Sequence, residues 1–323
     1  EALDVERFAV VYDGIEAGLL RDANARFATL RDAGKLSGFI PGEQPNARGA
    51  EAMGMRPRQG GLDSRAMFEA ARDGKLAVLS LFGVNPILRY ADGALARAAL
   101  ERAAFVVVSE LFMTETALQA SLVLPARGPF EKDGHVLDMT GRPLAVAAGL
   151  APPPGTLSDG EMVVALGAEL GVAVPTPSEL ADAAVTPPAK DHAQLPTTPA
   201  AAPGTPADDA SLRLAIASNI FAGGGTARFD ELIGGLRPGP SLLIAAACAA
   251  KLGIADGDLV DVTAGERAIR GLRVRLDAGA PADVVAVFDG IPDAQANALA
   301  DGESVAIANV RKPTAAAAAG GRM

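Results

Sequence analysis

The polar residues best placed to bind a ligand lie in two loops, each of which follows an apolar, strand-like run. The loop Gly83–Pro86 follows Leu76–Phe82, and the loop Ser109–Thr116 follows Phe105–Ser109. Open parallel sheets bind ligands in the loops at the carboxyl ends of their strands. The candidates for ligand contact in these loops are Gly83, Asn85, Thr114, Glu115 and Thr116.

Each loop also has a purely structural interpretation. The first can be a turn that ends at Pro86, with Asn85 at a special backbone angle. In the second, Thr114-Glu115-Thr116 can cap a helix and place an acid in its first turn, where the helix dipole favours it. The two interpretations of the second loop are compatible, because a capping segment can also contact a ligand.

A third candidate is the glycine run Gly223–Thr226, which in isolation resembles a phosphate cradle. The lysine and hydroxyl residue that open the helix of a P-loop do not follow it, so the motif is incomplete. The competing interpretation is a flexible hairpin loop. Gly224, Gly225 and Thr226 therefore join the candidate residues.

Metal and nucleophile chemistry is restricted by the counts of residue types. The 323 residues include one cysteine, Cys248, and two histidines, His135 and His192. An iron–sulfur cluster needs about four thiolates, and a structural zinc site about four ligands. Cys248 lies in an alanine-rich stretch and is expected in the core. His135 has no evident serine or cysteine to activate. We expect no metal ligands and no catalytic residue in this chain.

Charge and hydropathy exclude two further classes of partner. The formal net charge is −10 and the isoelectric point about 4.8, without a stripe of lysine and arginine for a phosphate backbone. The mean hydropathy is +0.22, but the longest apolar run, Leu242–Ala250, is too short to span a bilayer. We expect neither nucleic-acid binding nor direct insertion into a membrane.

The first half of the chain alternates strand-like and helix-like segments, which predicts an α/β fold with a parallel sheet covered by helices. The predicted strands are Arg7–Tyr12, Leu36–Ile40, Leu76–Phe82, Phe105–Ser109 and Leu122–Leu124. The predicted helices are Glu16–Arg31, Ser64–Arg72, Ala94–Ala103 and Ser158–Gly171. The residues between Gly42 and Gly61 are expected to form a long irregular loop.

The composition changes after residue 173. Residues 174–206 contain eight prolines among alanine and threonine, which indicates an extended linker. Short strands then follow at regular spacing and predict a small barrel. The predicted barrel strands are Leu212–Ser218, Leu242–Ile244, Leu259–Thr263, Ala268–Leu276, Asp283–Phe288 and Ser304–Ala308. The expected domains are 1–173 (α/β), 174–210 (linker), 211–312 (barrel) and 313–323 (flexible tail).

Three segments resemble the molybdopterin oxidoreductase superfamily. They are TETALQASLVLPARGPF followed by EKDGHVLDMTGR at residues 114–142, SLLIAAACAAKLGIADGDLVDV at 241–262, and the VAIANVRK ending at 305–312. In that superfamily the first segment lies near a pterin cofactor, and the C-terminal region is a double-psi β-barrel that caps the dinucleotide. The resemblance implies that Glu131, Gly134 and Arg142 are further cofactor-binding candidates.

Within the superfamily, LFGVNPI at 81–87 and LRLAIASNIFAGGGTARFDEL at 212–232 resemble the large peripheral-arm subunit of bacterial NADH–quinone oxidoreductase. The resemblance implies the C-terminal half of a longer protein whose cysteine-rich N-terminal region carries the iron–sulfur clusters. It further implies other peripheral-arm subunits as partners, and a cytoplasmic location at the membrane through the complex.

The chain departs from the superfamily pattern at positions that bear on the cofactor. His135 replaces the usual threonine, Asp138 the usual asparagine, and Ser121 a frequent aspartate. A carboxylate beside a pyrophosphate is repulsive, so Asp138 argues against a bound pterin dinucleotide. Any remaining site is therefore expected to be vestigial.

Three hypotheses follow for the function. The first is a redox-silent scaffold portion of an NADH–quinone oxidoreductase subunit, without a cofactor of its own and not catalytic by itself. The second is the C-terminal half of an active molybdenum or tungsten pterin oxidoreductase, similar to a formate dehydrogenase. The third, an unrelated α/β binding protein with a β-barrel appendage, leaves the ordered set of motifs unexplained and ranks last.

Overall fold

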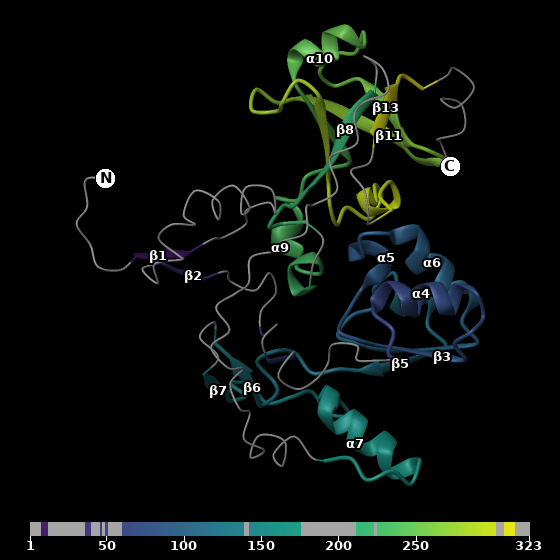
Figure 1. Ribbon diagram of the computed structural model, residues 1–323, viewed down its shortest axis with the longest axis vertical. Coiled ribbons are helices and arrows are strands. Elements are labelled where there is room, and N and C mark those ends of the chain that lie inside the picture. The colour runs from purple at the N-terminus through teal and green to yellow at the C-terminus, as the bar shows by residue number, and fades with distance from the viewer. Residues whose placement is uncertain are drawn as a thin grey trace. The chain divides into compact units, whose positions relative to one another are not determined.

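The computed structural model describes residues 8–11, 36–39, 46, 49–50, 60–138, 142–175, 211–222, 225–301 and 307–313 (Figure 1). The chain divides into two compact units. Unit 1 consists of Glu1–Asp63 and Ala126–Ala202, and unit 2 of Ser64–Pro125 and Pro203–Met323. Unit 2 therefore joins a short α/β segment to the C-terminal barrel, although residues 126–202 separate them in the sequence.

The α/β segment of unit 2 is built on a parallel sheet of three strands in the order β3-β4-β5. The strands are β3 Val78–Phe82, β4 Phe105–Glu110 and β5 Leu122–Pro125. Val78 aligns with Phe105, and Val107 with Leu122. This parallel register confirms the arrangement expected from the sequence, and it brings the loops after β3 and β4 to the same edge.

Helices cover one face of this sheet (Figure 1). They are α4 Ser64–Arg72, α5 Pro86–Arg89 and α6 Gly93–Arg102, and a 3-10 turn, η1 Ala117–Gln119, precedes β5. Alternate strand residues such as Leu79, Val106 and Val108 pack with Phe68 and Leu95 in a shared core. Burial of these apolar faces stabilises the segment.

The C-terminal part of unit 2 is a closed barrel in the order β10-β11-β9-β12-β8-β13. Its strands are β8 Ser211–Ala217, β9 Ser241–Ile244, β10 Leu259–Ala264, β11 Arg267–Leu276, β12 Val284–Phe288 and β13 Ile307–Arg311. Two parallel pairs, β8 with β12 and β9 with β11, are joined by antiparallel neighbours. This is the double-psi β-barrel that the sequence predicts.

The barrel interior is filled by alternate residues of its strands. Leu242, Val260, Leu272, Val274 and Val285 are each fully buried. The connections carry η2 Gly225–Arg228, α9 Glu231–Gly234, α10 Ala246–Lys251 and η3 Ala296–Ala298. Cys248 of α10 is buried in this core, as the sequence predicts, and burial raises the pKa of its thiol.

Unit 1 contains two small strand pairs and one helix among its described residues. Its elements are β1 Phe8–Val11, β2 Leu36–Phe39, β6 Gly134–Leu137, β7 Pro143–Val146 and α7 Asp159–Glu169. β1 and β2 are parallel, and β6 and β7 are antiparallel. Ser158 and Glu161 form a capping box at the start of α7, which lies within the helix expected over Ser158–Gly171.

The Glu131–Arg142 segment contains β6, because His135, Val136 and Leu137 pair with the apolar residues of β7. One strand boundary was predicted wrongly. The last barrel strand begins at Ile307 and continues to Arg311, beyond the end expected at Ala308. A strand boundary depends on where its partner ends, which local sequence does not encode.

Several predictions lie outside the described residues. These are the helix Glu16–Arg31, most of the loop 42–61, the linker from residue 176 onward and the tail from residue 314 onward. The bounds of the four expected domains stay predictions. In the part of the chain that the structure describes, no helix combines the length and the apolar composition needed to cross a membrane.

Candidate functional site

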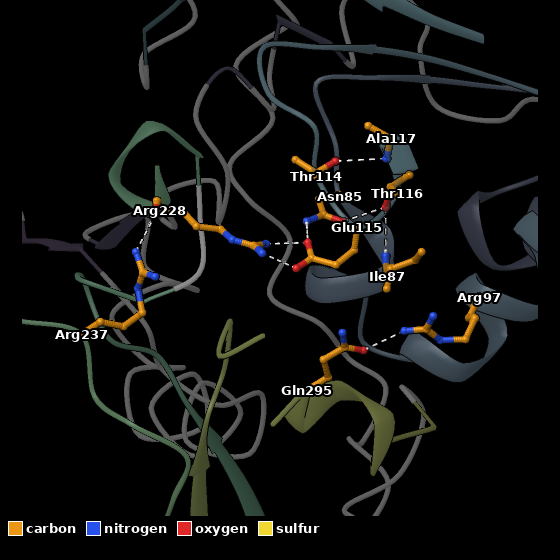
Figure 2. A network of polar contacts seen from close by, with 10 residues as sticks. All are labelled: Asn85, Ile87, Arg97, Thr114, Glu115, Thr116, Ala117, Arg228, Arg237 and Gln295. Atoms are coloured by element: carbon orange, nitrogen blue, oxygen red, sulfur yellow. Dashed lines mark hydrogen bonds and ion pairs between the residues drawn. The ribbon is translucent and has the colours of Figure 1, made fainter. Parts of the chain in front are cut away.

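A partly buried ion pair forms the centre of the candidate site (Figure 2). The two oxygens of the Glu115 carboxylate each accept a hydrogen bond from the Arg228 guanidinium, and the side chains are 18% and 14% exposed. A third hydrogen bond comes from Asn85, whose Nδ2 lies 2.8 Å from Oε2 of Glu115. Paired hydrogen bonds between arginine and a carboxylate combine charge with fixed geometry.

The hydroxyl groups of the same loop extend the network. Thr116 donates a hydrogen bond from Oγ1 to Oδ1 of Asn85 over 2.7 Å and accepts one from the Ile87 amide over 3.4 Å. The Thr114 hydroxyl accepts a 3.2 Å hydrogen bond from the Ala117 amide at the start of η1. Thr114 and Thr116 are both buried. The loop after β3 and the loop after β4 are thus hydrogen-bonded to each other.

The backbone explains why the two loops meet. Gly83 has a φ of 60°, and its amide donates a hydrogen bond to the Ser109 carbonyl at the end of β4. Pro86 begins α5 at a position where its missing N–H costs nothing. Asn85 has a φ of −117° and a ψ of 74°, outside the helical and extended regions, while the positive φ of the turn is at Gly83.

The charge of Glu115 is stabilised by its neighbours. Burial raises the pKa of the Glu115 carboxyl, but hydrogen bonds from Arg228 and Asn85 outweigh burial and hold the pKa below its ordinary value. Glu115 is therefore ionised near neutral pH. Its protonation would remove the attraction to Arg228.

Arg228 belongs to the connection between barrel strands β8 and β9. Arg228 ends η2, and the stacked rings of Phe112 and Phe229, with centroids 4.2 Å apart, lie next to the ion pair. The hypothesis of a hairpin loop at Gly223–Thr226 was wrong in its described half, because Gly225 and Thr226 open this 3-10 turn. Both residues are exposed, and Gly224 lies outside the described residues.

The remaining candidates belong to unit 1 and have local partners there. Glu131 accepts a hydrogen bond from the Gly128 amide over 2.7 Å, and Gly134 begins β6. Arg142 forms an ion pair with Asp138 at 2.8 Å. The structure thus brings together Gly83, Asn85, Thr114, Glu115 and Thr116, and describes Glu131, Gly134 and Arg142 separately.

Sequence reasoning missed the two arginines that organise the barrel side of the site. Arg228 pairs with Glu115, and Arg237 donates hydrogen bonds to the carbonyls of Phe221 and Arg228. The one available signal was an arginine two residues after the Gly-Gly-Gly-Thr run. Its partner lies 113 residues away, so only the folded chain identifies the pair.

A second group of contacts joins the barrel to the α/β segment. Asn297 of η3 is 3% exposed and donates hydrogen bonds to the carbonyls of Ile87 and Tyr90 at 3.0 and 2.9 Å. Arg267 pairs with Asp92, the cap of α6, at 3.1 Å.

Two further polar contacts complete this group. Arg97 donates a 3.0 Å hydrogen bond to Gln295 (Figure 2). Arg89 pairs with Asp289 at 2.6 Å, and burial raises the pKa of the Asp289 carboxyl although Arg89 opposes the rise. The barrel is thus fastened to the α/β segment by hydrogen bonds and ion pairs that do not involve Glu115.

The described residues offer polar and charged groups rather than metal ligands. Within the described ranges, no group of three or more histidine, cysteine, aspartate or glutamate side chains is arranged to hold a metal ion. The site can hold a loop in place, neutralise charge and donate hydrogen bonds. Among these described residues, no nucleophilic side chain is evident beside a base that could activate it.

Comparison with known proteins finds a family model that matches part of the chain. Residues 23–169 match the model of the family described as molybdopterin oxidoreductase. The chain is 31% identical over 253 residues to the G-type subunit of NADH-quinone oxidoreductase from Streptomyces coelicolor, and the match covers 72% of this chain and 29% of that protein. It is 35% identical over 122 residues to a G-type subunit of the same enzyme from Rhizobium meliloti, covering 36% of this chain and 14% of that protein.

Catalytic relatives are also similar. The catalytic subunit of an assimilatory nitrate reductase from Bacillus subtilis is 30% identical over 145 residues, or 43% of this chain and 20% of that protein. The chain thus spans less than a third of the length of each of these relatives.

The fold has a counterpart among solved structures. Acetylene hydratase from Pelobacter acetylenicus superposes with a TM-score of 0.58 at 16% sequence identity, over 77% of this chain and 46% of that one. At this identity the likeness concerns the fold alone.

Proposed function

We propose that the chain, whose residues 23–169 match the family model described as molybdopterin oxidoreductase, is a redox-silent scaffold portion of an NADH–quinone oxidoreductase subunit. The alignment to the Streptomyces coelicolor G-type subunit supports the assignment to NADH–quinone oxidoreductase, because it runs over 72% of the chain. The scaffold would support the electron-transfer part of the longer protein. We propose that iron–sulfur clusters lie in that other part, because this chain has one cysteine.

The observation that carries the proposal is the internal pairing of the candidate side chains. Asn85, Thr116 and Arg228 direct their polar groups at Glu115 and at one another. An anionic cofactor at this place would have to displace Glu115 from Arg228 or lie beside its carboxylate, where like charges repel. In their present arrangement these residues do not fit a pterin dinucleotide.

The candidates in unit 1 support the same conclusion. The Arg142 guanidinium is engaged by Asp138, whose side chain is 16% exposed, and the Asp138 carboxylate also accepts the Arg142 amide. Gly134 is committed to a strand rather than to a glycine turn that approaches a ligand. These local pairings suit a structural role, in which polar groups stabilise the fold instead of waiting for a cofactor.

The proposed partners are the other peripheral-arm subunits of the complex. A net charge of −10 and the lack of a basic stripe in the sequence argue against nucleic acid. We propose a cytoplasmic location, with attachment to the membrane through the complex. In this role the chain is part of an oxidoreductase without itself carrying out the chemistry.

The second candidate function is the C-terminal half of an active pterin oxidoreductase. The gathering of Asn85, Glu115 and Thr116 at the carboxyl end of β4 favours it, since ligands of α/β sheets bind at that edge. The similarity to a nitrate reductase catalytic subunit favours it as well. Under this alternative, Asn85 and Thr116 would hold the loop that contacts the cofactor.

The pterin and metal content of the complete natural protein that contains this chain distinguishes the two functions. The measurement combines the fluorescence of oxidised pterin with elemental analysis for molybdenum, tungsten and iron. We expect iron without pterin, molybdenum or tungsten. Stoichiometric pterin would overturn the scaffold proposal and favour the second candidate.

A further inference from the structure

The segment Gly225–Arg237, called the arm here, is tied together internally. Arg237 donates hydrogen bonds to the carbonyls of Phe221 and Arg228 at 3.2 and 2.7 Å, so it connects the end of the arm to its beginning. The Asp230 carboxylate accepts the amides of Leu232 and Ile233 and caps α9. The Arg237–Arg228 bond and the Asp230 bonds lie within the arm, so they persist if the arm moves as one piece, whereas the Phe221 carbonyl precedes the arm and belongs to its attachment to the barrel.

The arm meets the α/β segment at its beginning. There the Arg228 guanidinium holds Glu115, and Phe229 stacks on Phe112. Its outer side is open to solvent, since Leu232 is 89% and Leu236 61% exposed. An element whose outer side is exposed has few buried apolar contacts there, and such elements open locally at a low free energy.

The barrel itself does not depend on the arm for its attachment. Asn297 and the Arg267–Asp92 and Arg89–Asp289 pairs join other parts of the barrel to α5, α6 and their loops. Asn297 is buried, and the side chain of Asp92 is 5% exposed. Separation of Arg228 from Glu115 therefore leaves these contacts intact.

We propose that the arm Gly225–Arg237 opens and closes against the loop Phe112–Thr116 as a unit, with the Arg228–Glu115 ion pair as its latch. Closure shields the polar cluster of Asn85, Glu115 and Thr116, and opening exposes it to solvent. The inference concerns motion of the arm, and it holds for a scaffold as well as for a catalytic protein.

The latch has a specific energetic signature. Hydrogen bonds between charged groups are stronger than those between neutral ones, so removing the guanidinium favours the open state. Both side chains retain some exposure, so added salt also weakens their attraction. The Phe112–Phe229 stack is apolar, and salt does not screen it.

Distance measurements between two spin labels test the motion in the 323-residue chain. One label on the exposed Leu232→Cys reports the arm, and one on the exposed Arg102→Cys reports α6, in a Cys248→Ala background. We expect a single short distance that gains a longer component in Arg228→Gln. The open-to-closed ratio should rise by about tenfold or more, the size expected for a charged hydrogen bond.

Three controls make the result specific. Arg228→Lys keeps the charge but loses the paired geometry, so its open fraction should be intermediate. Arg213→Gln removes a more exposed ion pair, between Arg213 of β8 and Asp283 just before β12, and should leave the arm closed. Labels at Arg270→Cys and Arg102→Cys measure the distance between the barrel and α6, and this distance should stay the same in every variant.

The same distance measurement can be made with Arg228 retained, by changing the salt concentration. In the labelled chain that keeps Arg228, raising the salt from about 0.05 to about 1 M should increase the longer component. An unchanged arm distance in both Arg228→Gln and high salt would overturn the latch. A barrel distance that changes together with the arm distance would overturn an arm that moves separately.

Discussion

At the scale of single residues, Glu115 stands out because its neighbours decide its charge. A carboxylate with three hydrogen bonds from an arginine and an asparagine is better stabilised in the folded chain than in water. The same three bonds hold two loops and an arm together. Loss of the charge therefore affects structure as well as electrostatics.

The pH dependence of stability follows from this shift. The pKa of Glu115 is lower in the folded chain than in the unfolded chain, so its contribution is fully present above the unfolded value of about 4.3 and is lost as pH falls through the folded value. At neutral pH we expect Glu115→Gln to lower the free energy of unfolding by about 1–3 kcal/mol. The difference from the parent chain should shrink below about pH 4.3.

Urea unfolding as a function of pH measures this difference. Glu101→Gln makes the same chemical change at an exposed position of α6 and should have little effect at any pH. A difference between Glu115→Gln and the parent that stays constant down to about pH 3 would contradict the assignment of the shift to Glu115.

At the scale of secondary-structure elements, η3 and α6 are in unusually close contact. The Asn297 side chain lies against Gly93, the first residue of α6, and reaches past it to the carbonyls of Ile87 and Tyr90. A Cβ on Gly93 would lie 2.4 Å from Nδ2 of Asn297. The close approach requires glycine for space rather than for backbone freedom.

We therefore expect Gly93→Ala to lower the free energy of unfolding by about 1–3 kcal/mol, the usual effect of overpacking. This is opposite in sign to the gain that alanine over glycine usually brings inside a helix. Gly234→Ala in α9 is the matched control, because a Cβ there meets no atom within 4 Å. Thermal unfolding of the two variants checks the prediction, and equal midpoints would contradict it.

At the scale of the whole molecule, the barrel supplies the largest continuous core among the described residues. Residues from its strands, α10 and η3 share one apolar cluster, in which Leu242, Leu272 and Val274 are fully buried. Large buried side chains are the positions where a cavity costs most. The exposed leucines of the arm belong to no such core.

We expect Leu242→Ala to lower the free energy of unfolding by about 2–5 kcal/mol because it leaves a cavity in the barrel. Leu232→Ala makes the same change at an 89% exposed position and should change stability by less than about 0.5 kcal/mol. Urea unfolding followed by circular dichroism compares the two. A similar loss in both variants would show that burial does not decide the effect.

Much of the fold follows from local patterns in the sequence. The apolar runs around Leu79 and Val106 predict strands, and alternate residues of these strands are buried beneath the helices. The alternation in β11 likewise reflects one buried face. Ser158 caps α7 through contacts only three residues away. Such elements were predictable because the interactions that define them are short-range.

The candidate site was predictable only in part, for the opposite reason. The sequence by itself determined that Asn85 and Thr114–Thr116 end neighbouring strands, because strand and loop patterns are local. Only the tertiary structure decided that Glu115 is paired with Arg228 and that Asn297 lies against Gly93, contacts that join residues far apart in the sequence. Local sequence does not encode such partners, since closure of the barrel and its packing on the sheet bring them together.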